Sequence, residues 1–110
     1  MTVAKLRKLL LSFPGVTEVP HFDRQAFRTK RKIFATVGAD QRVNLKIEPE
    51  EARNGLMESF PRAFHSLGGW TRLGYVAVAL AHVDEELLRQ LVTEAYQAAL
   101  PRPPAARRRR

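Results

Sequence analysis

Four cationic side chains fall within five consecutive residues in the first third of the chain: Arg28, Lys30, Arg31 and Lys32. The stretch RVNLKIE, residues 42–48, adds Arg42 and Lys46 on the polar side of an alternating pattern. Clustered lysines and arginines neutralise phosphates and release their counterions, so this pattern predicts a DNA-binding surface. The alternative is a solvated hairpin whose lysines discourage edge-to-edge aggregation.

The net charge of +8 is unevenly distributed along the chain. Residues 1–46 hold ten lysines and arginines against three acids, whereas residues 47–100 hold four against eight. Residues 101–110 hold five arginines and no acid, and Arg107–Arg110 would add affinity for any polyanion without selecting one. The distribution therefore places the basic character in the first half and at the C-terminal end.

Trp70 and Arg72 lie together in the glycine-containing segment GGWTRLG, residues 68–74. A single tryptophan more often packs in a core or at its rim than serves as a stacking platform. If the ring is exposed beside Arg72, it could stack on a base. The same loop and the open face of the sheet support an alternative function, a non-catalytic module that holds a protein or a small ligand.

The sequence gives no support for catalysis or metal binding. It contains no cysteine, and its motifs include neither a nucleophile elbow GxSxG nor a P-loop. The histidines are too far apart for a metal-binding motif such as HExxH: His21, His65 and His82. Two acidic pairs, Glu50–Glu51 and Glu85–Glu86, begin predicted helices, where the helix dipole accounts for them. We expect no enzymatic activity, no cofactor and no metal.

The first half of the chain predicts one helix followed by strands. Apolar residues at helical spacing favour a helix over residues 3–13, which Pro14 and Gly15 end. The hydrophobic period then changes to two, most clearly where Arg42, Asn44 and Lys46 alternate with apolar residues. Strands are therefore expected at residues 18–22, 26–29, 32–37 and 42–48.

The second half predicts two helices around one strand. Pro49 is expected to begin a helix that Pro61 ends, and Asp84 to cap the last helix. Residues 61–74 are interpreted as a loop and residues 75–80 as a strand. The order helix, three or four antiparallel strands, helix, strand, helix indicates an α+β fold, a mainly antiparallel sheet with helices packed on one face. The other face would carry the polar residues of the strands.

Length and composition are those of one domain, expected over residues 1–100, with a disordered tail rich in proline and arginine at 101–110. No apolar run approaches the ~18 residues of a membrane-spanning helix. We therefore expect a cytoplasmic monomer without membrane contact, with DNA or, alternatively, a protein as its partner.

Six short segments share their order and spacing with one known family: PGV (14–16), HFDRQAFRTKRKIFATV (21–37), VNLKI followed by PEE (43–51), PRAF (61–64), GWTRLGY (69–75) and VDEELLRQLVTEAY (83–96). Over about residues 3–100 the chain resembles the MmcQ/YjbR family of small bacterial proteins. The resemblance implies a frataxin-like α+β arrangement. It also implies a likeness to the "double wing" DNA-binding domain of a phage transcription factor, so DNA is the implied partner.

The resemblance supplies no catalytic or ligand-binding residues. Iron binding, which depends on an acidic first helix in frataxins, is disfavoured because Lys5, Arg7 and Lys8 occupy the first helix here. The glycine usual before the lysine of KIFA is Arg31 in this chain. Arg31 would then lie at the tip of a basic hairpin that acts as a wing.

Overall fold

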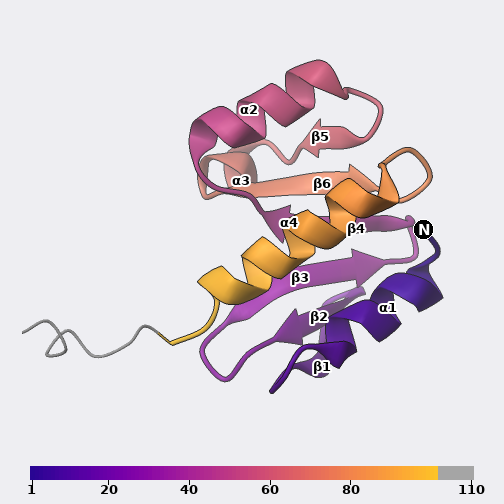
Figure 1. Ribbon diagram of the computed structural model, residues 1–110, viewed down its shortest axis with the longest axis vertical. Helices are drawn as coiled ribbons and strands as arrows, with labels where there is room; N and C mark the ends of the chain where they lie inside the picture. The colour runs from indigo at the N-terminus through magenta and orange to yellow at the C-terminus, as the bar shows by residue number, and fades with distance from the viewer. Residues whose placement is uncertain (102–110) are drawn as a thin grey trace, which may run out of the picture.

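Six antiparallel strands form one sheet in the order β1-β2-β3-β4-β6-β5 (Figure 1). The computed structural model describes residues 1–101, so the predicted arginine tail lies, from residue 102, outside the described residues. The strands are β1 (Thr17–His21), β2 (Arg24–Arg28), β3 (Ile33–Gly38), β4 (Arg42–Lys46), β5 (Phe64–Ser66) and β6 (Tyr75–Ala79). Pro20 lies in β1, at the edge of the sheet, where a missing N–H is tolerated.

Helices cover one face of this sheet. They are α1 (Val3–Ser12), α2 (Glu50–Ser59), α3 (Gly69–Arg72) and α4 (Glu85–Ala98). Figure 1 shows α1 and α4 lying on the same side of the strands, with α2 beside β5. The Asp84 side chain accepts the Leu87 N–H, so this residue caps α4 as the sequence predicts. The predicted α+β fold is confirmed.

The core lies between the sheet and helices α1 and α4. Alternation along β4 turns Val43 and Leu45 towards the helices, and both are fully buried. An aromatic cluster closes one end, where Phe13 stacks on Tyr96 at 4.6 Å between ring centroids. Phe34 meets Tyr96 edge-on, and the Tyr96 hydroxyl donates to the Pro14 carbonyl at 2.7 Å.

The loop predicted over residues 61–74 is wrong in two places, because β5 and α3 both lie within it. A strand of three residues is too short for alternation to show in the sequence. It forms because Phe64 enters the core and pairs with Val78 of β6, fourteen residues later in the chain. The sheet therefore has six strands, more than the predicted order contains.

No helix within residues 1–101 combines the length and the apolar content that crossing a bilayer requires.

The turn between β2 and β3 is fixed to the end of α4. The chain turns between the two predicted strands of this hairpin, and the Thr29 N–H donates to the Lys32 carbonyl at 3.0 Å. The Thr29 side chain is 4% exposed. Its hydroxyl donates to the Ala99 carbonyl at 2.8 Å and accepts the Arg31 N–H at 3.1 Å. The basic turn therefore packs against the helical layer and does not project as a free wing.

We predict that Thr29→Val lowers the free energy of unfolding by about 1–3 kcal/mol, because valine keeps the shape and leaves buried polar groups unpaired. Thr17→Val is the matched control, since Thr17 is an exposed strand residue for which no side-chain hydrogen bond is found within residues 1–101. Urea unfolding of both variants measures the difference. Equal stabilities of the two variants would show that the Thr29 hydroxyl does not hold the turn.

Candidate functional site

Six of the predicted contact residues lie at one end of the strands, along the side of the sheet that crosses β2, β3, β4 and β6. In the antiparallel register, Arg28 at the end of β2 pairs with Ile33 at the start of β3. Lys46 at the end of β4 pairs with Tyr75 at the start of β6. The turn residues Lys30, Arg31 and Lys32 and the α3 residue Arg72 adjoin these strand ends. We name this cluster the basic edge: Arg28, Lys30, Arg31, Lys32, Lys46 and Arg72.

Arg42 does not belong to this cluster. It begins β4, whereas Lys46 ends it, and four residues of strand separate their Cα atoms by about 13 Å. Beside it Arg24 lies over β3 and β4, donating to the Arg42 carbonyl at 2.8 Å and pairing with Asp40 at 3.0 Å. Arg42 and Lys46, predicted together on the polar side of one strand, therefore lie at opposite ends of β4, and Arg42 is apart from the other six.

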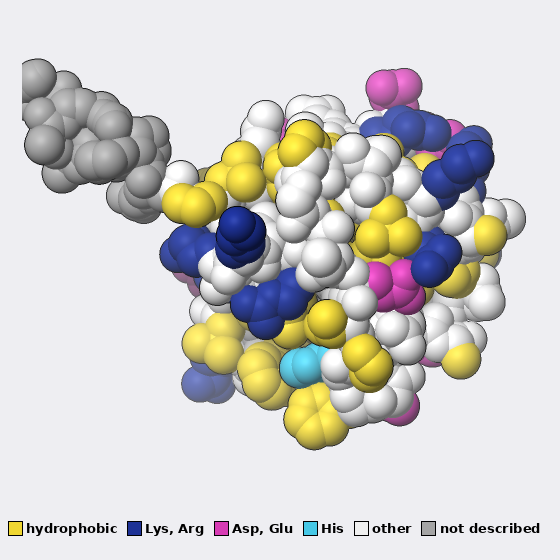
Figure 2. Space-filling view, turned by 90° about the horizontal axis from the view of Figure 1, so that it is seen from below, with side chains coloured by type: hydrophobic (Ala, Val, Ile, Leu, Met, Phe, Trp, Pro, Cys, Tyr) yellow, Lys and Arg dark blue, Asp and Glu magenta, His cyan; other side chains and the backbone are white. Residues whose placement is uncertain are grey.

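Among the described residues, no carboxylate forms an ion pair with a cation of the basic edge. Within residues 1–101, none of the six forms an ion pair, whereas five other cations do: Lys5, Arg7, Arg24, Arg53 and Arg89. Figure 2 shows Lys and Arg side chains gathered beside the place where the described chain ends, while acidic side chains accompany the cations on the opposite side. The edge therefore presents positive charge that no ion pair within residues 1–101 neutralises.

Two of the arginines are held by backbone carbonyls. Arg31 donates from Nη2 to the Ala98 carbonyl at 3.1 Å, where the negative end of the α4 dipole lies. Arg28 donates from Nε to the Thr29 carbonyl at 3.1 Å. A carbonyl orients a guanidinium without cancelling its charge, so both groups stay available to an anion while their positions are restricted.

The crowding of cations at the basic edge affects the pKa of Lys32. Partial burial, the ammonium of Lys46 and the guanidinium of Arg31, in that order, lower the pKa of Lys32 below 10.5, and Glu48 opposes this shift. The protonated form that predominates at neutral pH is therefore destabilised by the fold.

Trp70 is exposed rather than part of the core or its rim. Its exposed fraction is 65%, and that of Leu73, at the end of the same helix, is 59%. The Thr71 hydroxyl holds this segment to β6, since it accepts the Leu67 N–H at 2.7 Å and donates to the Tyr75 carbonyl at 2.8 Å. Trp70 thus lies on the surface, two residues from Arg72 of the basic edge.

No cluster of potential metal ligands is found in the part of the chain that the structure describes. No three His, Asp or Glu side chains there are close enough to hold a metal ion. His21, His65 and His82 lie on β1, on β5 and after β6. His65 bonds the Arg62 carbonyl at 2.9 Å, whereas the Ser66 hydroxyl donates to the Thr71 hydroxyl at 3.4 Å.

These observations define a small two-layer α+β protein with helices on one face of an antiparallel sheet and an unneutralised basic edge. The sequence model of the YjbR family matches residues 11–98. The chain therefore belongs to the YjbR family.

A solved structure agrees with this assignment. The chain is similar to the crystal structure of a Deinococcus radiodurans protein with a DUF419 domain, at 25% sequence identity and a TM-score of 0.78. The similarity covers 88% of this chain and 77% of that one. No functionally curated protein matches the sequence.

We predict that Lys32→Gln raises the stability of the protein at pH 7 by about 0.3 kcal/mol, the size found for like-charge pairs on helices. A lysine whose pKa is lowered in the folded state destabilises that state fully below the folded pKa. The cost disappears as pH rises from there to 10.5. The advantage of the variant should therefore vanish at high pH.

The control for this prediction is Lys30→Gln, which removes an exposed lysine from the same turn. Thermal unfolding across the pH series compares both variants with the unaltered protein. A stability gain that persists above pH 10.5, or one shared by Lys30→Gln, would contradict the electrostatic explanation.

Proposed function

We propose that this protein binds DNA through the phosphate backbone, without catalysis, and that the basic edge makes the principal contacts. The observation that carries the proposal is the convergence of six cations without carboxylate partners within residues 1–101 on one edge of the sheet. Such cations release counterions from phosphates, and this supplies most of the affinity of sequence-independent binding. Arg42 would add a separate contact, and a cytoplasmic location is part of the proposal.

The geometry of the basic edge suits contacts with the phosphate backbone of DNA better than contacts with its bases. Arg28 and Arg31 are oriented by main-chain carbonyls, and the turn that carries them packs against α4 instead of entering a groove. From Arg28 on β2 to Tyr75 on β6 the edge crosses three strand spacings, about 14 Å. A surface of this kind positions a protein on nucleic acid, whereas sequence selection needs side chains that reach the bases.

We predict that Lys30→Gln, Lys46→Gln and Arg72→Gln together flatten the dependence of log affinity on log salt. Each lost phosphate contact lowers the slope by about 0.9 on duplex DNA. None of the three side chains makes a hydrogen bond or ion pair within residues 1–101, so their removal should leave the fold intact. Fluorescence anisotropy with a labelled duplex, over a salt series beginning near 50 mM, measures the slope.

The matched control removes the same charge from the helical layer, with Lys5→Gln, Arg7→Gln and Lys8→Gln on α1. The proposal requires a smaller effect from the α1 variant than from the basic-edge variant. A chain without residues 102–110 measures the contribution of their five arginines separately. Absence of duplex binding by the full chain at low salt would refute the proposal.

A second function is favoured by one observation, the exposure of two apolar side chains, Trp70 on α3 and Leu73 at its C-cap. Exposed apolar patches mark contact sites for proteins or small ligands. A non-catalytic interaction module would use this patch and the open face of the sheet.

The fluorescence of Trp70 separates the two functions, because the chain has one tryptophan. Stacking on a base predicts quenching by a single-stranded oligonucleotide, and a loss of about 1–3 kcal/mol of binding free energy in Trp70→Ala. Leu73→Ala is the control, since leucine is exposed beside it and cannot stack. Undiminished fluorescence on binding would place the patch outside the DNA interface and favour the interaction module.

A further inference from the structure

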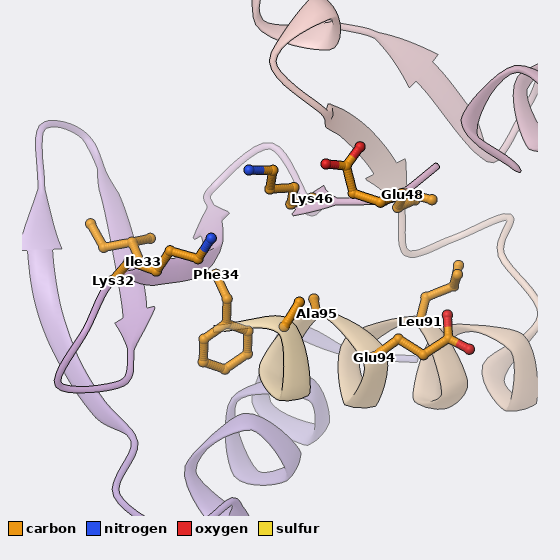
Figure 3. A pocket seen from close by; sticks show the side chains of 10 residues that line it. Lys32, Ile33, Phe34, Lys46, Glu48, Leu91, Glu94 and Ala95 are labelled. Atoms are coloured by element: carbon orange, nitrogen blue, oxygen red, sulfur yellow. The ribbon is translucent and has the colours of Figure 1, made fainter. Parts of the chain in front are cut away.

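A cavity of about 180 Å³ opens at the basic edge, between the start of β3 and the end of β4. Residues 32–34 at the start of β3 and residues 46–48 at the end of β4 form its sides, and α4 forms its floor (Figure 3). The cavity therefore lies within the basic edge, but its shape results from the course of the strands and not from the cations.

The cavity exists because β3 and β4 separate at this end. Their pairing stops at Ala35 and Leu45, whereas β4 continues beside β6, where the Ile47 N–H donates to the Gly74 carbonyl at 2.8 Å. On the helix below, Ala95 and Ala98 face the gap, and their methyl groups are too short to fill it. The space is therefore produced by strand divergence above two small residues.

The lining is apolar below and cationic at the mouth. Phe34, Ile47 and Leu91 contribute buried apolar side chains. Figure 3 shows the amines of Lys32 and Lys46 extending towards each other from the two separated strands. Their mutual repulsion contributes to the lowered pKa of Lys32. An anion between these two amines would relieve that repulsion.

The two acids at the cavity do not supply that anion. Glu48 pairs with the buried Arg53 at 2.7 Å, and Arg53 also donates to the Ile47 carbonyl at 2.9 Å. Glu94 extends along α4, away from the two amines (Figure 3). Within residues 1–101, neither Lys32 nor Lys46 has a carboxylate partner within 4.0 Å. The Arg31 guanidinium is directed to the Ala98 carbonyl at 3.1 Å.

We propose that this cavity binds a small amphipathic anion, with an aromatic or short aliphatic group over Ala95 and a carboxylate or phosphate between Lys32 and Lys46. A cavity of about 150 Å³ lined by apolar side chains holds benzene, so 180 Å³ is enough for a single ring. The inference rests on the cavity and the two amines, and it stands whether or not the protein binds DNA.

The test is an NMR titration of the full chain with four probes that separate the ring from the charge. Phenyl phosphate and benzoate carry both, benzyl alcohol carries the ring alone, and inorganic phosphate carries the charge alone. Saturable shifts of the Ile47, Leu91 and Ala95 methyl signals are expected with at least one of the first two, which also identifies the preferred anion. The other two probes should bind at least about tenfold more weakly, the loss expected for one charge-assisted contact or one buried group.

Ala98→Leu tests the cavity directly, because Ala98 lines the space and a leucine side chain would fill it. The substitution should preserve the fold, since Ala98 is exposed on α4 and leucine favours helix. It should abolish the methyl shifts while leaving the salt slope of DNA binding unchanged. Lys46→Gln should weaken phenyl phosphate about tenfold. If Ala98→Leu alters the fold, Ala95→Leu fills the same space from the next turn of the helix.

Lys30→Gln with Arg72→Gln is the reciprocal control, since both residues lie outside the cavity lining. This variant should lose DNA affinity and keep phenyl phosphate binding, so failure of one proposal is distinguishable from failure of the other. No saturable shift with either amphipathic anion would overturn the inference. Equal binding of inorganic phosphate, or full binding by Ala98→Leu, would overturn it as well.

Discussion

The buried hydroxyl of Thr29 joins the turn between β2 and β3 to the end of α4, and the cations of the basic edge on this turn depend on it for their positions. One oxygen donates to the Ala99 carbonyl and accepts the N–H of Arg31, so it fixes both the shape of the turn and its place. A hydroxyl this deeply buried is costly without partners, and the contact is therefore favoured over a mobile loop. It also sets the positions of Lys32 and Ala98, which line the cavity between β3 and β4.

The charges of this edge are arranged at a cost to stability. Lys5 and Arg7 on α1 pair with carboxylates, whereas Lys32 and Lys46 face each other, and neither forms an ion pair within residues 1–101. Selection for stability alone favours replacing one of two such lysines, and strained or repulsive groups are commonly retained where function needs them. The same electrostatic argument supports a macromolecular anion along the edge and a small one within it, because both neutralise the same pair of amines.

The family assignment and the fold leave the function to be argued from the site. Membership of the YjbR family and the likeness to the Deinococcus radiodurans protein account for the six-stranded sheet and its helices. One fold hosts many unrelated activities, so a DNA-binding role drawn from fold analogy carries little weight by itself. The unpaired cations and the cavity beside them are properties of this chain's own residues, and they make separable claims.

The sequence alone was enough to predict three elements, because their signals are local. Leucine spacing predicted α1, clean alternation around Val43 and Leu45 predicted β4, and Asp84 predicted the start of α4. It also identified the cations of the basic edge. Which of these cations meet depends on strand pairing: register places Lys46 with the turn and Arg42 elsewhere, and packing leaves Trp70 exposed. The same holds for β5 and the cavity, because strand pairing, strand divergence and helix docking join residues far apart in the chain, and no local pattern encodes them.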